Sequence, residues 1–120
     1  MGTSYRDLVA WRKEMAFVTA IYRATESFPK DETYGLTSQL RRAAVPVPSK
    51  IAEGQIRYSQ RELHHFLSHA RGSLVEAETQ IMIASDLDYL SLRTADTLLL
   101  QAAGVGESPE RDQHVHEISR

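Results

Sequence analysis

The sequence predicts an all-α protein, an antiparallel four-helix bundle of the up-and-down type with a kinked second helix. Apolar side chains recur every three or four residues over long segments, which is the spacing of one helix face. Proline, glycine and helix-capping residues separate these segments, and no stretch shows a convincing strand pattern. The chain has 120 residues, enough to bury one core without disulfides or a metal.

The first helix is predicted from about Leu8 to Thr25. It stops at Phe28-Pro29, because proline disfavours helical geometry in the residue before it. Ser4, with Asp7 three residues later, resembles a weak capping box. The expected inward stripe consists of Leu8, Trp11, Met15, Val18, Tyr22 and Thr25.

The second helix is predicted from Gly35 to Glu53, with Gly54 as its C-terminal cap. Its expected inward residues are Leu36, Leu40, Ala43, Ala44, Val47 and Ile51. Each of its two prolines lacks an amide hydrogen and crowds the carbonyl four residues earlier. We therefore predict a kink or a break between Val45 and Pro48.

The third helix is predicted from Ser59, which forms a capping box with Glu62, to about Tyr89. A helix of this length spans about 45 Å and sets the length of the bundle. Its expected core stripe is Leu63, Leu67, Ala70, Leu74, Ala77, Ile81 and Ala84. A shorter fourth helix follows, from about Leu92 to Ala103. Residues 1–106 are expected to form the bundle domain and residues 107–120 a polar, disordered tail.

The outward side of the third helix changes character along its length. Its first half is polar and basic, with Arg61, His64, Ser68 and Arg71. Its second half carries Gly72, Val75, Thr79, Met82 and Ile83. A helix that is apolar all round is buried all round, so the second half is a candidate homo-oligomer interface. The alternative is that the fourth helix or the tail covers this patch within one chain.

Charge is unevenly spread, although the formal net charge is only −2. Residues 41–71 contain six basic side chains and two acidic ones, whereas residues 72–103 contain one and five. The six basic residues, a candidate nucleic-acid surface, are Arg41, Arg42, Lys50, Arg57, Arg61 and Arg71. The alternative is a solvated helix surface on which these cations pair with Glu53, Glu62 or acidic residues of a neighbouring copy.

No pattern of catalytic or metal-ligating residues is evident, and we expect no cofactor. His65 and His69 stand four residues apart, but a zinc site needs a third ligand and none is firmly placed. Glu76 and Glu78 point about 160° apart on a helix, so they cannot act as a facing acid and base. No apolar run is long enough to span a membrane, and the N-terminus does not read as a signal peptide. We expect a cytoplasmic protein that is not an enzyme.

Several short motifs, taken in order, resemble those of one protein family. They are Tyr5-Arg6-Asp7-Leu8, Trp11, Phe28-Pro29-Lys30-Asp31-Glu32, the stretch 34–54, Gly72-Ser73-Leu74, Glu76, Glu78, Gln80 and Tyr89-Leu90. The family is the four-helix-bundle proteins of the 23S rRNA intervening-sequence type, related to the accessory variability determinant of diversity-generating retroelements. The resemblance implies a small helical bundle that assembles into a ring, with a pentamer favoured.

Residues and resemblance together predict a non-enzymatic oligomeric scaffold or adaptor with an RNA, DNA or nucleoprotein partner. The alternative is a protein-interaction ring that binds no nucleic acid. Salt separates the two, because phosphate contacts weaken steeply as salt rises whereas an apolar contact hardly changes.

Overall fold

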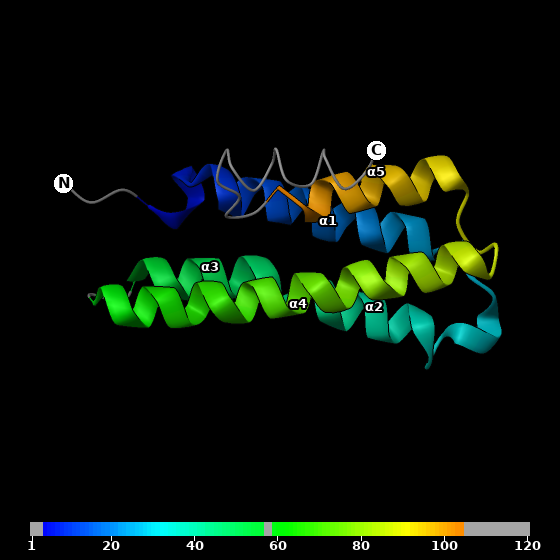
Figure 1. Ribbon diagram of the computed structural model, residues 1–120, viewed down its shortest axis with the longest axis horizontal. Helices are drawn as coiled ribbons and strands as arrows, with labels where there is room; N and C mark the ends of the chain where they lie inside the picture. Colours follow the sequence, from blue (N-terminus) through cyan, green and yellow to red (C-terminus); the bar gives the residue numbers. More distant parts are fainter. Residues whose placement is uncertain (1–3, 57–58, 105–120) are drawn as a thin grey trace, which may run out of the picture.

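The computed structural model describes residues 4–56 and 59–104, and these ranges contain no strand. The helices are α1 (Val9–Thr25), α2 (Leu36–Ala44), α3 (Pro46–Ile56), α4 (Gln60–Asp86) and α5 (Leu92–Ala102), with short 3₁₀ turns η1 (Tyr5–Asp7) and η2 (Lys30–Glu32). Helices α2 and α3 follow one another end to end and act as one rod of the bundle (Figure 1). The predicted tail, residues 107–120, lies outside the described residues.

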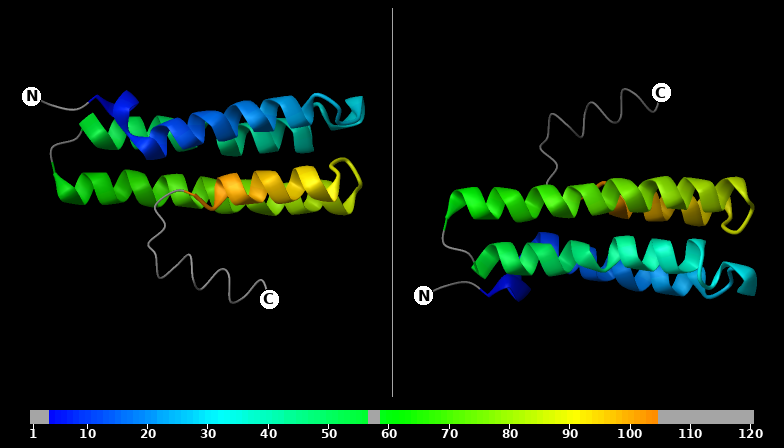
Figure 2. Two further views of the ribbon diagram at one scale, coloured as in Figure 1. Left: turned by 90° about the horizontal axis from the view of Figure 1, so that it is seen from above. Right: turned by 90° about the horizontal axis from the view of Figure 1, so that it is seen from below.

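The rods pack in a closed square in which sequence neighbours are also neighbours in space. Helix α4 packs against α2, α3 and α5, and α1 packs against the same three helices. Helices α1 and α4 therefore lie on a diagonal, and successive rods run antiparallel (Figure 2). This arrangement confirms the predicted up-and-down four-helix bundle.

The predicted interruption of the second rod is a break rather than a kink. Val45 is a turn residue between α2 and α3, and its amide still donates to the Arg41 carbonyl at 3.1 Å. Pro46 begins α3, a place where the missing amide hydrogen has no partner to lose. The predicted inward residues of this rod are all buried.

Gly54 does not cap the rod, which corrects the sequence prediction, because α3 continues to Ile56. Gly54 is buried against α4 instead. A Cβ atom at this position would lie 3.0 Å from Leu63 Cδ1 and 3.2 Å from Phe66 Cβ. Glycine therefore serves here to let the α3 backbone approach α4 closely.

The predicted inward stripe of α1 is wrong in part: Leu8, Trp11 and Val18 are half-buried and pack against the core, but the centre of the buried face lies elsewhere. Its buried residues are Glu14, Phe17, Ile21 and Thr25. Met15 and Tyr22 are 42% and 41% exposed, and of the predicted stripe only Thr25 is fully buried. The apolar surface of α1 is wide, and Glu14 stands in the middle of its buried arc. Because Glu14 makes the buried arc less apolar, the neighbouring arc had the more apolar pattern in the sequence and was predicted to face inward.

Serine side chains cap α4, α5 and η1, whereas Leu8 at the start of α1 provides no side-chain cap, so the predicted caps are confirmed in part. The Glu62 amide donates to Ser59 Oγ at 3.0 Å at the start of α4, and the Ser59 hydroxyl donates to Glu62 Oε1. Ser4 Oγ accepts from the Arg6 amide at 3.2 Å, so it caps η1 rather than α1. Helix α4 ends at Asp86, slightly earlier than predicted, and Asp88 adopts a left-handed conformation (φ 62°) in the following turn.

One carboxylate joins two distant elements at the end of the bundle where α2 begins. The Leu36 amide donates to Glu32 Oε1 at 3.0 Å, and the Tyr89 hydroxyl donates to Glu32 Oε2 at 2.9 Å. These two hydrogen bonds lower the pKa of Glu32, and the same carboxylate raises the pKa of Tyr89. Glu32 therefore connects the N-terminus of α2 to the turn between α4 and α5.

Candidate nucleic-acid and oligomer interfaces

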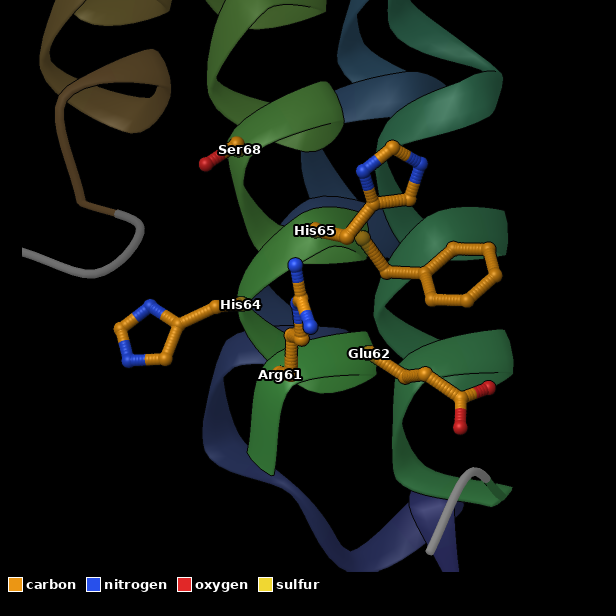
Figure 3. A pocket seen from close by; sticks show the side chains of 6 residues that line it. Arg61, Glu62, His64, His65 and Ser68 are labelled. Atoms are coloured by element: carbon orange, nitrogen blue, oxygen red, sulfur yellow. The ribbon is translucent and has the colours of Figure 1, made fainter. Parts of the chain in front are cut away.

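The outward face of α4 begins with an open hollow. The hollow has a volume of about 620 Å³ and is lined by Arg61, Glu62, His64, His65, Phe66 and Ser68. Figure 3 shows that Glu62 points towards α3, whereas His64 points away from it. Apart from half-buried Phe66, these side chains are exposed, so the hollow is open to a large ligand.

The histidines on this part of α4 lie close together. The His65 and His69 rings have their centroids 4.5 Å apart and are tilted by 59°. No group of three histidine, cysteine or carboxylate side chains that could hold a metal occurs within residues 4–56 and 59–104. The pair therefore adds two adjacent polar rings to the face of α4.

Arg41 serves as a link between α2 and α1. Its Nε donates to Thr25 Oγ1 at 2.9 Å and its Nη2 donates to the Tyr22 carbonyl at 3.2 Å. The guanidinium also lies over the Tyr22 ring, 4.4 Å from its centroid. Because two of its donors and one face of its guanidinium are used within the chain, Arg41 is the least available of the described candidates for phosphate contact.

The other basic candidates are spread over three helices. Lys50 on α3 lies 3.6 Å from Glu53 and 5.5 Å from the Phe66 ring centroid. Arg71 is half-buried on α4, where burial raises the pKa of Glu78 and the Arg71 charge lowers it. Arg42 and Arg61 are exposed, and Arg57 lies outside the described residues. The structure thus gathers Arg61 with the histidines, and the five candidates that it describes are spread over α2, α3 and α4.

The second half of the α4 face is apolar and uncovered by the described part of the chain. Val75, Met82 and Ile83 are 55%, 49% and 44% exposed, and Thr79 is exposed between them. Helix α5 packs against α4 but leaves this stripe open. A Cβ atom at Gly72 would meet nothing within 4 Å, so the packing of the single chain does not require glycine there. We call Gly72, Val75, Thr79, Met82 and Ile83 the α4 stripe.

Sequence reasoning missed the most unusual side chain of the core. Glu14 is fully buried, and neither of its carboxylate oxygens has a hydrogen-bond partner in the described structure. Burial raises the pKa of this carboxyl to about 8, against a smaller opposite effect of the Lys13 charge. The available signal in the sequence was that helical spacing places Glu14 on the same side of α1 as the apolar residues Phe17 and Ile21.

The described helices include none that is long and apolar enough to cross a membrane. A search of curated proteins found no match to the chain. A family model described as "23S rRNA-intervening sequence protein" matches residues 6–108, which is most of the sequence. With its helical bundle, the chain therefore belongs to the family of 23S rRNA-intervening sequence proteins.

Proposed function

We propose that this protein is a non-enzymatic, cytoplasmic, oligomeric scaffold or adaptor that holds a nucleic acid or a nucleoprotein partner. The supporting observation is the division of the outward face of α4. Its first half presents Arg61 and exposed imidazoles around an open hollow, and its second half presents an uncovered apolar stripe. The first half suits contact with phosphates, and the second suits contact with protein.

The basic half of this face is suited to weak, repeated phosphate contacts. Arg61, His64 and Ser68 are exposed on successive turns, and Arg71 follows at the end of the row. Such a row spans about 15 Å along the helix. One copy offers too few cations for tight binding, but a ring repeats the row and raises avidity. A pentamer is the assembly we favour, and the family's name makes structured RNA the first ligand to test.

The arrangement of carboxylates supports a non-catalytic role. Glu76 is exposed and Glu78 is half-buried, so the two differ in environment as well as in direction along α4. Glu14 has a raised pKa but is fully buried and touches no solvent. An acid or base needs to reach its substrate, and Glu14 does not.

The second candidate is a protein-interaction ring that binds no nucleic acid. It is favoured by the cations that are already engaged within the chain. Arg41 is bonded to α1, and Lys50 is paired with Glu53. On this view the polar half of the α4 face is an ordinary solvated surface.

The deciding experiment is a fluorescence-anisotropy titration of the intact oligomer with a structured RNA and with a DNA duplex, at low and at physiological salt. The test variant is Arg61→Gln/Arg71→Gln, and the matched control is Arg12→Gln/Lys30→Gln, which removes the same charge away from α4. We expect micromolar binding that weakens with salt, is lost in the test variant and is kept in the control. Absence of binding to both probes at low salt would favour the protein-interaction ring.

A further inference from the structure

A groove runs along the seam between α1 and α5. It consists of two adjoining hollows that share Thr97 and Gln101. The residues of the first, whose volume is about 350 Å³, are Lys13, Ala16, Thr97, Leu100, Gln101 and Gly104. The second is lined by Ala20, Arg23, Ala24, Arg93, Thr94, Thr97, Leu98 and Gln101. Alanine at every fourth position of α1 keeps the floor of this groove low. We call it the α1/α5 groove.

The groove is positively charged and the α4 stripe is flanked by negative charge. Among the described residues, the groove lining includes Lys13, Arg23 and Arg93 and no carboxylate. Beside the stripe, Glu76 and Asp86 are exposed, and helical spacing places Asp86 on the same side as Val75. The two surfaces are therefore complementary in charge as well as in shape, one concave and one convex.

Two further observations indicate that these surfaces lack packing partners within a single chain. Gln101, which lines both hollows, has a buried Oε1 atom with no hydrogen-bond partner in the described structure. Gly72 faces open space in the chain, although glycine inside a helix costs about 1 kcal/mol relative to alanine. A second backbone packed near Gly72 would give this glycine a structural reason.

We infer that the α4 stripe of one copy docks into the α1/α5 groove of the next copy, head to tail. This inference rests on the proposed assembly and identifies its contact surfaces. The stripe and the flanking Asp86 extend for about 20 Å, and α5 for about 16 Å, so their lengths match. Because α1 and α4 lie on a diagonal of the bundle, one copy presents both surfaces at once. Two different surfaces per copy produce a ring when the rotation closes.

The test uses two variants of the full chain, each with one surface disabled. The stripe variant is Val75→Lys/Met82→Lys, and the groove variant is Ala16→Glu/Thr97→Glu. All four positions are exposed, so the fold should survive, as far-UV circular dichroism would show. Matched controls on the same helices are Ser68→Lys on α4 and Thr19→Glu on α1, both exposed and outside the two surfaces.

Sedimentation velocity then compares each variant with an equimolar mixture of the two. We expect each variant alone to be a monomer of 13.5 kDa, and both controls to keep the wild-type mass. The mixture should form a heterodimer and nothing larger, because the stripe variant keeps its groove and the groove variant keeps its stripe. Should a variant lose its fold, Thr79→Lys and Leu100→Glu replace it at other exposed positions of the same surfaces.

The other outcomes separate this inference from the proposed function. A monomeric wild type would overturn both the assembly and this contact. A wild-type oligomer that persists in either variant would leave the assembly standing and overturn this pairing of surfaces. Two monomeric variants that stay monomeric when mixed would show that an intact stripe does not dock into an intact groove, which also overturns the head-to-tail contact.

Discussion

Helices α1 and α4 lie on the same diagonal of the bundle, yet they differ in which side chains they bury and which they expose. Helix α4 buries small and aliphatic side chains together with the uncharged amide of Gln80, and it leaves an apolar stripe exposed on its outer side. Helix α1 buries the carboxyl of Glu14 and leaves Met15 and Tyr22 partly exposed. The difference teaches that apolar spacing identifies the inward face less reliably where an ionisable side chain stands in the middle of that face.

The largest expected effect concerns the pH dependence contributed by Glu14. Its pKa is about 8 in the folded chain against 4.5 in the unfolded one, so the unfolded state releases this proton first as pH rises. The free energy of unfolding should therefore fall by roughly 4 to 5 kcal/mol in total between about pH 4.5 and pH 8. Above that window it should level off. Urea denaturation from pH 5 to pH 9 measures it.

The matched variant for this prediction is Glu14→Gln, which keeps the size of the side chain and cannot titrate. The wild type should lose stability relative to this variant as pH rises through that window. Parallel curves for the two proteins would mean that Glu14 is not kept neutral by burial, and the contrast drawn between α1 and α4 would fail.

The next effect compares the inward and outward sides of α4. Ile81 is fully buried, whereas Ile83, two residues later, is 44% exposed. Ile81→Ala should lower the free energy of unfolding by about 2 to 5 kcal/mol, because it removes methyl groups and leaves a cavity. Ile83→Ala should cost less than about 1 kcal/mol in a dissociated chain. Chemical denaturation of the two variants at high dilution compares them, and equal losses would contradict the assigned face.

A third effect tests how α1 is attached to its neighbour α2. Arg41→Ala removes two hydrogen bonds to α1 and leaves the Tyr22 carbonyl without this donor. We expect a loss of about 1 to 3 kcal/mol, whereas Arg42→Ala, at an exposed position, should stay within about 0.5 kcal/mol of the wild type. Thermal unfolding of both variants gives the comparison. Similar midpoints would show that Arg41 is a surface residue like its neighbour.

The smallest effect concerns two helical glycines. Gly72→Ala should stabilise the dissociated chain by up to about 1 kcal/mol, because open space surrounds that position. Gly54→Ala should destabilise it, because the new methyl group meets Leu63 and Phe66 at about 3 Å. Denaturation at high dilution measures both signs, and a stabilising Gly54→Ala would contradict the close approach of α3 to α4.

The same comparison explains how far the fold follows from sequence. The inward residues of α2 and α3 are apolar or small without exception, so only one face of this rod fits the pattern. That face is buried, which confirms the prediction. On α4 the predicted stripe is also buried, apart from half-buried Leu63 and Leu67 near its start, and buried Gln80 lies beside it. On α1 a single carboxyl on the buried arc displaced the predicted face. Gly54 was misplaced because a cap and a close helix contact both favour glycine.

The candidate surfaces were only partly predictable, for a different reason. The α4 stripe belongs to one helix, so helical spacing alone brings its residues together, and its role as an interface remains a prediction. The α1/α5 groove needs two helices, and no pattern within one segment reveals it. Arg41 bonds to a carbonyl of another helix, and a backbone partner leaves no mark in the sequence.

The two hydrogen bonds of Glu32 have a consequence for how fast backbone amides at this end of the bundle exchange with solvent. Leu36 stands in the first turn of α2, where an amide without a capping partner would exchange within the fastest class of the helix. Its bond to Glu32 depends on a carboxylate that also holds Tyr89, so opening there requires two distant segments to separate together. The N-terminus of α2 should therefore exchange in step with the turn between α4 and α5, as one cooperative unit at that end of the bundle.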